Sequence, residues 1–272
     1  MEDALAAKQD ALRGVLSRLE AAVVAYSGGV DSTFLAASAH EVLGVRSVAV
    51  TAVSPSLARR ELREAKAVAR RMGWNHLVVG TKEVWREEYA RNAPDRCYWC
   101  KTELFEVLEP IARDRRAAIL VGTNADDLGD YRPGLRAAEE HSVRAPLVEA
   151  GLAKSEVRAL SSMLGLSTAD KPASPCLSSR FAYGVRVTAE GLRRVERAEE
   201  VIRSLGFEIF RVRDHGDLAR IEVAPPEIAR AAALSPTIQR ELTSLGFRYV
   251  TLDLAGFRSG SMNEVLPPPK LR

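Results

Sequence analysis

Short apolar runs alternate with helical stretches along the first two thirds of the chain. The apolar runs have the length and composition of buried strands, and they cover residues 21–25, 46–53, 75–80 and 117–122. Apolar side chains recur at helical spacing in residues 4–19, 32–39 and 57–72. This alternation predicts an α/β fold, a doubly wound parallel sheet whose ligands bind at the carboxyl ends of the strands.

The pattern changes after about residue 184. An amphipathic helix over residues 188–205 precedes three strands with alternating polar and apolar positions, at residues 207–213, 218–223 and 248–253. Such alternation is typical of a sheet with one solvated or ligand-facing surface. We therefore expect an α/β domain over residues 1–184 and a smaller α+β domain for substrate binding or oligomerisation over residues 185–272.

A glycine-rich turn joins the first predicted strand to the helix that follows it. Its glycines let the backbone expose several N–H groups at a helix N-terminus, which favours binding of phosphate. The carboxylate within the turn indicates a bound cation, most simply Mg²⁺. No Gly-Lys-Ser/Thr is present, so the turn is not a Walker A loop; it resembles the PP-loop of ATP pyrophosphatases. The residues expected to bind ATP here are Ser27, Gly28, Gly29, Asp31 and Ser32.

A second polar loop, Gly122-Thr123-Asn124-Ala125-Asp126-Asp127, follows the fourth predicted strand. Parallel strands bring this loop to the same sheet edge as the glycine-rich turn. Gly122, Asp126 and Asp127 are therefore further candidates for ATP binding, and paired carboxylates suit Mg²⁺. The plainer interpretation of the two aspartates is a turn or helix cap.

The chain has three cysteines, an odd number that does not suit a disulfide framework. Cys97 and Cys100 form a Cys-x-x-Cys pair, which could bind zinc, run a redox cycle or, with Cys176, hold a [4Fe–4S] cluster with one open iron. Cys176 lies between Pro175 and Arg180, in a loop whose serines and arginine can bind anions. A packed cysteine in a linker is the alternative for Cys176.

These motifs together resemble the LarE family of ATP-dependent sulfur insertases. The resemblance covers nearly the whole chain, and its segments are residues 27–32, 96–101, 122–127, 130–134, 175–180 and 253–263. It implies that ATP adenylates a carboxylate of pyridinium-3,5-biscarboxylic acid mononucleotide, with release of pyrophosphate. Sulfur then displaces AMP to give a thiocarboxylate for the nickel-pincer nucleotide cofactor.

The resemblance also implies two sources of sulfur. In one branch of the family the residue that matches Cys176 is the sole cysteine and gives up its own sulfur. This chain departs from that branch because it carries Cys97 and Cys100, and so it resembles the branch with a three-cysteine [4Fe–4S] cluster. We expect the cluster, with the sacrificial Cys176 as the alternative.

The implied substrate is anionic and aromatic, which suggests its binding residues. Arginines suit carboxylate and phosphate, glutamates can hold a cation or orient the substrate, and tryptophan can stack on adenine or on the pyridinium ring. The plainer alternatives are a solvated strand face for the two strand arginines and core packing for the tryptophan. The candidates are Trp99, Ser179, Arg180, Glu199, Arg211, Arg213 and Glu222, with Cys176, Asp31 and Arg180 as the catalytic residues.

Net charge and composition indicate what kind of molecule the protein binds. A formal net charge of +3 is modest, so we expect a small nucleotide substrate and no nucleic acid. No signal peptide or membrane span is evident, and we expect a cytoplasmic homo-oligomer. A tRNA thiolase, an ammonia-using adenylating synthetase and a non-catalytic nucleotide sensor remain as alternatives.

Overall fold

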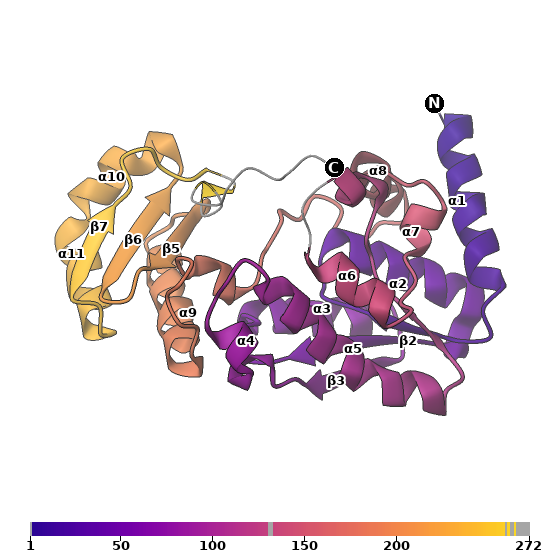
Figure 1. Cartoon of the computed structure of the whole chain (residues 1–272). Coiled ribbons are helices and arrows are strands. Elements are labelled where there is room, and N and C mark those ends of the chain that lie inside the picture. The colour runs from indigo at the N-terminus through magenta and orange to yellow at the C-terminus, as the bar shows by residue number, and fades with distance from the viewer. Residues whose placement is uncertain (1, 130–132, 259, 262–263, 265–272) are drawn as a thin grey trace. The chain divides into compact units, whose positions relative to one another are not determined.

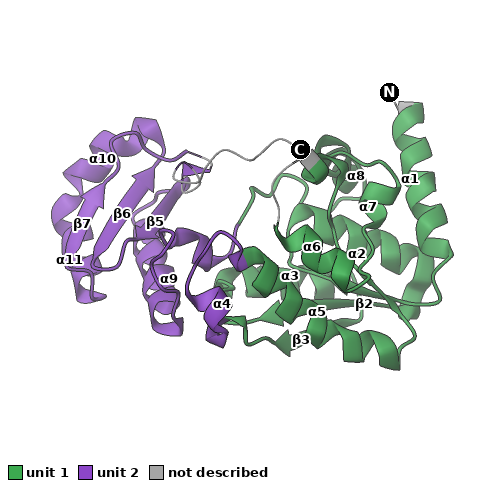
Figure 2. Ribbon diagram, in the orientation of Figure 1, with its two compact units in different colours: residues 1–83, 97–174 green, residues 84–96, 175–272 purple. Residues whose placement is uncertain are grey.

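The computed structural model divides the chain into two compact units (Figure 2). The first unit comprises residues 1–83 and 97–174, and the second comprises residues 84–96 and 175–272. The structure describes residues 2–129, 133–258, 260, 261 and 264. Residues 130–132, 259, 262 and 263 of the quoted motifs lie outside the described residues. The expected domain boundary at residue 184 stays a prediction.

The first unit is an α/β sandwich around a parallel sheet (Figure 1). Its strands lie in the order β3-β2-β1-β4, and all pairs are parallel. Short 3₁₀ turns η1 (Gly44–Arg46), η2 (Glu83–Trp85) and η3 (Ala125–Gly129) connect some elements. The helices and strands are α1 (Glu2–Ser17), β1 (Ala22–Ala25), α2 (Val30–Leu43), β2 (Ser47–Val53), α3 (Arg59–Arg71), β3 (His76–Gly80), α5 (Arg96–Asp114), β4 (Ala118–Leu120), α6 (Pro133–Glu140), α7 (Pro146–Glu149) and α8 (Lys154–Met163).

Alternating side chains of β1 enter two different cores, as the period of a strand requires. Ala22 and Val24 pack with α1, α2 and α8, while Val23 packs with α5 and α6. Both faces of the sheet are therefore covered by helices, which confirms the predicted doubly wound α/β fold. β4 is shorter than expected. Val121, the next residue, donates to the carbonyl oxygen of Arg144 at 2.9 Å, as part of an isolated parallel bridge between Leu120 and Arg144.

The second unit is a small mixed sheet covered by helices. Strand β5 pairs antiparallel with β6, and β6 pairs parallel with β7. The apolar core lies between this sheet and α9, α10 and α11. The elements are α4 (Glu87–Ala90), the 3₁₀ turn η4 (Leu177–Arg180), α9 (Ala189–Ser204), β5 (Phe210–Asp214), β6 (Leu218–Val223), the 3₁₀ turn η5 (Pro225–Glu227), α10 (Ile228–Ala233), α11 (Ser235–Ser244) and β7 (Tyr249–Leu252).

The topology of the first unit decides where a ligand binds. β2 lies on one side of β1 and β4 on the other, so the chain reverses its direction of winding beside β1. Open parallel sheets bind ligands at the carboxyl ends of the strands at such a switch point. The loops after β1 and β4 meet there. Among the described residues, no helix is long and apolar enough to cross a membrane.

Candidate functional site

The loop between β1 and α2 is a compact turn built on two glycines. Gly28 has a φ of +76°, and a Cβ atom there would lie 2.9 Å from the Cβ atom of Ala65 on α3. The hydroxyl oxygens of Ser27 and Ser32 lie 3.0 Å apart. Gly29 caps α2 without a side chain, so the N–H groups of the first turn can bind phosphate oxygens.

The loop after β4 touches this turn at Gly122. A Cβ atom at Gly122 would lie 2.8 Å from the backbone nitrogen of Ser32 and 3.0 Å from the carbonyl carbon of Asp31. Any larger residue would therefore push the two loops apart. The two predicted ATP-binding segments are brought together at one sheet edge.

The two aspartates of the second loop both cap backbone groups. Asp127 Oδ2 accepts the N–H of Asn124 at 3.0 Å, and Asp126 Oδ2 accepts the N–H of Lys154 at 2.9 Å. The side-chain oxygen of Asn124 in turn accepts the N–H of Asp126 at 3.0 Å. These hydrogen bonds agree with the interpretation of the two aspartates as turn or helix caps. A role of the two carboxylates in binding Mg²⁺ stays a prediction.

Asp31 is the carboxylate of the glycine-rich turn, and its role in binding Mg²⁺ stays a prediction. Its side chain is 22% exposed and lies in the first turn of α2. Oδ2 forms an ion pair with Lys154 Nζ, and Oδ1 accepts a hydrogen bond from Asn124 Nδ2 at 3.4 Å. Mg²⁺ commonly binds one or two carboxylates together with substrate phosphates and water, so one carboxylate fits it. No group of three or more His, Cys, Asp or Glu side chains able to hold a metal was found within the described part of the chain.

The Cys-x-x-Cys pair lies in the first turn of α5, a helix that the sequence pattern did not predict. Cys97 is exposed and Cys100 is half-buried, and their three-residue spacing places both thiols on one helix face. The Trp99 ring is half-buried and packs edge-on against the Tyr98 ring at 5.0 Å between centroids. Two thiols on one accessible helix face are donors that fit iron or zinc.

The loop that carries Cys176 belongs to the second unit and is tightly braced. The carbonyl oxygen of Cys176 accepts hydrogen bonds from Ser179 N at 3.0 Å, Ser179 Oγ at 2.8 Å and Arg180 Nη1 at 3.2 Å. Ser178, two residues after Cys176, is fully buried, and its hydroxyl oxygen lies 2.5 Å from that of Tyr89. Cys176 itself is exposed, so a rigid loop presents its thiol to solvent.

Arg180 and Glu199 form a buried ion pair. Arg180 Nε and Nη2 donate to the two carboxylate oxygens of Glu199 at 2.8 and 3.2 Å, and both side chains are less than 10% exposed. Nη1 of Arg180 donates to the carbonyl oxygen of Pro175 at 2.7 Å. Arg180 therefore joins α9 to the loop that carries the exposed thiol. Whether it also contacts substrate stays a prediction.

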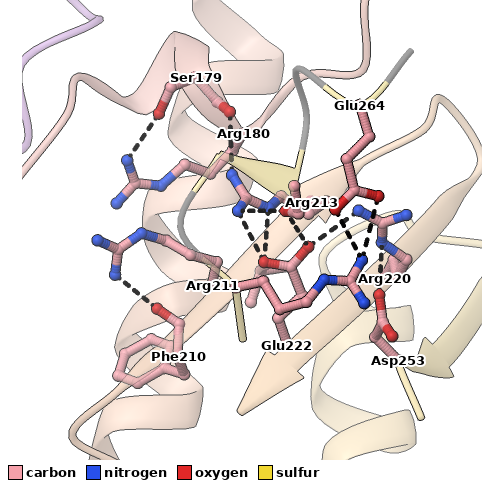
Figure 3. Close-up of polar contacts among 12 residues, drawn as sticks. Ser179, Arg180, Phe210, Arg211, Arg213, Arg220, Glu222, Asp253 and Glu264 are labelled. Carbon is pink, nitrogen blue, oxygen red and sulfur yellow. Dashed lines mark hydrogen bonds and ion pairs between the residues drawn. The ribbon is translucent and has the colours of Figure 1, made fainter. Parts of the chain in front are cut away.

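Arg213 is buried in a second cluster, centred on Glu222 (Figure 3). Its Nε and Nη2 donate to Glu222 Oε2 at 3.0 and 2.7 Å, and its Nη1 donates to the carbonyl oxygen of Ser179 at 3.1 Å. Arg220 and Ser261 donate to the other oxygen of Glu222, at 2.9 and 3.1 Å. The solvated-face interpretation therefore does not apply to Arg213.

Arg211 is placed differently, although it lies on the same strand. Its Nη1 donates to the carbonyl oxygen of Phe210 at 2.6 Å, and its guanidinium lies 5.2 Å from the centre of the Phe257 ring. Figure 3 shows the side chain directed away from Glu222, and no ion pair of Arg211 with a described carboxylate is found. Burial lowers the pKa of Arg211 and the positive charges of Arg180 and Arg213 lower it further, while the negative charges of Glu199 and Glu222 oppose this in part. A role of Arg211 in binding the anionic groups of the substrate stays a prediction.

Several residues of these sites were not predicted from the sequence. Lys171 Nζ forms ion pairs with Glu61 at 2.7 Å and Glu64 at 3.0 Å, behind the glycine-rich turn. Burial opposes ionisation of Glu64, but hydrogen bonds from Arg60 and Lys171 outweigh it and lower its pKa. The sequence signal that could have pointed to Lys171 was the scarcity of lysine among the basic residues. The others missed are Asn124, Lys154 and Ser261.

Comparisons with known proteins extend over the whole chain. Residues 9–121 match the family model described as asparagine synthase. The chain is 41% identical over 269 residues to the pyridinium-3,5-bisthiocarboxylic acid mononucleotide synthase of Lactiplantibacillus plantarum, covering 98% of each chain. It is 47% identical over 266 residues to an uncharacterized protein of Synechocystis, covering 96% of this chain and 99% of the relative. A tRNA-specific 2-thiouridylase of Rickettsia felis is 31% identical over 191 residues, which cover 56% of this chain and 52% of the relative.

Proposed function

The chain belongs to the LarE family, the pyridinium-3,5-bisthiocarboxylic acid mononucleotide synthases within the PP-loop ATP pyrophosphatases, and from this premise we propose that it is an ATP-dependent sulfurtransferase. Its proposed substrate is pyridinium-3,5-biscarboxylic acid mononucleotide, and its products are the thiocarboxylate, AMP and pyrophosphate. The observation that carries the proposal is the similarity to the Lactiplantibacillus plantarum synthase across 98% of both chains.

The first step is adenylation at the carboxyl edge of the parallel sheet. A carboxylate oxygen of the substrate attacks the α-phosphorus of ATP, and the bond to the bridging oxygen of the β-phosphate breaks. The N–H groups around Gly28 and Gly29, together with the hydroxyls of Ser27 and Ser32, bind the phosphates. Asp31 would hold Mg²⁺, which neutralises the leaving pyrophosphate.

The second step is sulfur transfer. A sulfur nucleophile attacks the acyl carbon, and AMP leaves with the former carboxylate oxygen. A [4Fe–4S] cluster held by Cys97, Cys100 and Cys176 would supply that sulfur when bound. The alternative is the Cys176 thiol as a sacrificial donor. In both cases the exposed Cys176 takes part in sulfur donation. Arg180 holds the conformation of its loop through the hydrogen bond to the carbonyl oxygen of Pro175.

The substrate's phosphate and carboxylates require cations that are not already neutralised. Arg211 lies half-buried beside Phe257, where it can bind an anion. Arg213 shares Glu222 with Arg220, and this buried cluster is proposed to support the surface. Trp99 and Ser179 stay candidate substrate contacts, and a homo-oligomer stays the expected assembly.

The test separates the proposed reaction from the other members of the superfamily. Purified protein is incubated with Mg²⁺, ATP and sulfide, and with either the pyridinium nucleotide, unmodified tRNA or ammonia. We expect pyrophosphate and a sulfur-containing product only with the pyridinium nucleotide. Formation of thiolated tRNA would instead indicate a tRNA thiolase, the activity named for the partly similar 2-thiouridylase. Asp31→Ala should lower pyrophosphate release by about 10²–10³-fold.

A further inference from the structure

The segment of residues 84–96 belongs to the second unit, although the first unit continues on both sides of it in the sequence. It bonds to the part of the chain that follows the Cys176 loop. The N–H of Val187 donates to the carbonyl oxygen of Ala90 at 2.8 Å. The segment therefore lies against the same stretch of chain that presents the exposed thiol.

Asn92 anchors this segment with its side chain. It is fully buried, and its φ of +56° lies in the left-handed region, which asparagine tolerates better than most residues. Its Nδ2 donates to the carbonyl oxygens of Ala182 and Val185 at 2.8 and 3.0 Å. Its Oδ1 accepts a hydrogen bond from Arg96 Nη1, so the guanidinium of Arg96 is held in one orientation.

Three buried guanidinium groups donate to backbone carbonyl oxygens of residues 175–179. Arg96 Nη1 donates to the carbonyl oxygen of Ser178 at 2.9 Å. Arg180 donates to two earlier carbonyl groups of this loop, and Arg213 donates to the following one. Each of the three arginines is less than 10% exposed. Hydrogen bonds from ionised donors are stronger than those between neutral groups, so these bonds fix the path of the loop backbone.

Arg96 is the first residue of helix α5, and Cys97 follows it directly. We propose that Arg96 is a positioning residue for the sulfur donor, because it fixes the loop that carries the Cys176 thiol. Cys176 takes part in sulfur donation under either source of sulfur, so the role of Arg96 does not depend on which source is used. The inference rests on the proposed function.

The two steps of the proposed reaction should respond differently to a loosened loop. Adenylation uses the glycine-rich turn of the first unit, so the acyl adenylate should still form. Attack by sulfur should slow, and water then hydrolyses the acyl adenylate to AMP and the original carboxylate. Less thiocarboxylate therefore forms for each pyrophosphate released. A merely structural role would lower both products together, through loss of folded protein.

The test compares Arg96→Met and the conservative Arg96→Lys with wild type. Arg91→Met is the matched control, because Arg91 lies on the same segment, is 51% exposed and pairs with Asp95 at 2.8 Å. Anaerobically prepared full-length protein is incubated with Mg²⁺, ATP, sulfide and the pyridinium nucleotide, and the ratio of thiocarboxylate to pyrophosphate is measured. Hydrogen exchange of residues 175–181 is followed by mass spectrometry without substrates. Thermal unfolding shows that each variant is folded.

Tyr89→Phe is a second variant, for the case that a change of the buried Arg96 prevents folding. The hydroxyl oxygen of Tyr89 lies 2.5 Å from that of Ser178, and Phe keeps the ring. Tyr89→Phe should lower the ratio of thiocarboxylate to pyrophosphate in the same direction as Arg96→Met, by a smaller factor. If Arg96→Met does not fold, an unchanged ratio in Tyr89→Phe overturns the inference.

We expect Arg96→Met to lower the ratio of thiocarboxylate to pyrophosphate by about 10- to 100-fold. The N–H of Phe181 also bonds to the carbonyl oxygen of Ser178, at 3.2 Å, so exchange of the loop amides should be about tenfold or more faster. Arg96→Lys should lie between Arg96→Met and wild type, and Arg91→Met should match wild type.

An unchanged ratio in folded Arg96→Met overturns the inference, as does unchanged exchange of the loop. Failure of the proposed function shows separately, as wild-type protein that makes no pyrophosphate.

Discussion

Lys171 Nζ lies 3.2 Å from the carbonyl oxygen of Gly28 and bonds at the same time to Glu61 on α3. One ammonium group therefore ties the glycine-rich turn to the helix behind it. Ser174, the last residue of the first unit, donates to the same glutamate at 3.0 Å. The segment that leads to the Cys176 loop is thus fastened to the nucleotide turn within the first unit.

Replacement of Lys171 by Met should loosen that turn. The variant leaves Glu61 and Glu64 without their shared cation, and we expect a loss of about 1–2 kcal/mol in the free energy of unfolding, because the cluster is partly exposed. Affinity for ATP should fall as well. Urea denaturation and calorimetry measure the two effects, and Lys66→Met, an exposed lysine on α3, is the control. The prediction is wrong if Lys171→Met and Lys66→Met have the same free energy of unfolding and the same affinity for ATP.

The buried Arg180–Glu199 pair should affect the free energy of unfolding far more than an ion pair on the surface does. Removing one partner of a buried pair leaves an uncompensated charge, so Glu199→Gln should destabilise the protein by about 3–5 kcal/mol in denaturant unfolding. Arg186 and Glu87 make a bidentate pair of similar geometry with both side chains more than half exposed. Glu87→Gln should leave the free energy of unfolding nearly unchanged, because solvent screens an exposed pair. Similar costs for the two variants would refute the structural role of Glu199.

Arg211 and Arg213 should respond differently to the same substitution. Arg211→Lys loses the planar guanidinium at an anion-binding position, so we expect about tenfold weaker binding of the pyridinium nucleotide with normal stability. Arg213→Lys breaks the bonds to buried Glu222, so we expect lower stability first. Substrate titration together with thermal unfolding separates the two. An Arg211→Lys variant that binds substrate like wild type would return this arginine to a structural role.

The three cysteines distinguish the two sulfur sources. With a cluster, anaerobically prepared protein is brown, contains iron and sulfide, and loses sulfur transfer when Cys97, Cys100 or Cys176 becomes Ala. With a sacrificial thiol, the protein is colourless, tolerates Cys97→Ala and Cys100→Ala, and stops after about one turnover per chain. Absorption spectra, iron analysis and turnover counts decide between the two.

The sequence pattern predicted the parallel sheet because buried strands and their loops leave a local signature. The run before Ser27 is apolar, and the turn that follows is rich in glycine, so strand, loop and helix could be placed from the sequence. Helix α5 was missed because its first turn, around Cys97 and Cys100, lacks a clear apolar spacing. Strand β5 begins at Phe210, three residues later than expected, since its first positions lie outside the pairing with β6.

The ion pairs of the site could not be predicted, because they join residues far apart in the sequence. Lys154 and Asp31 are 123 positions apart, and Lys171 and Glu61 are 110 apart. No spacing rule connects such residues until the strand order is known. Arg211 and Arg213 looked alike on one strand face. The register places Arg211 opposite Glu222, yet it is the Arg213 side chain that reaches this carboxylate, and a sequence pattern does not give side-chain direction.

An isotope experiment shows whether a carboxylate of the substrate is adenylated and then exchanged for a thiocarboxylate. Pyridinium-3,5-biscarboxylic acid mononucleotide is labelled with ¹⁸O in its carboxylates and incubated with the protein, Mg²⁺, ATP and sulfide without oxygen. Mass spectrometry then follows AMP and the product. We expect one ¹⁸O atom in each AMP and one sulfur atom in the product for each pyrophosphate released. Unlabelled AMP, or pyrophosphate without sulfur in the product, would contradict it.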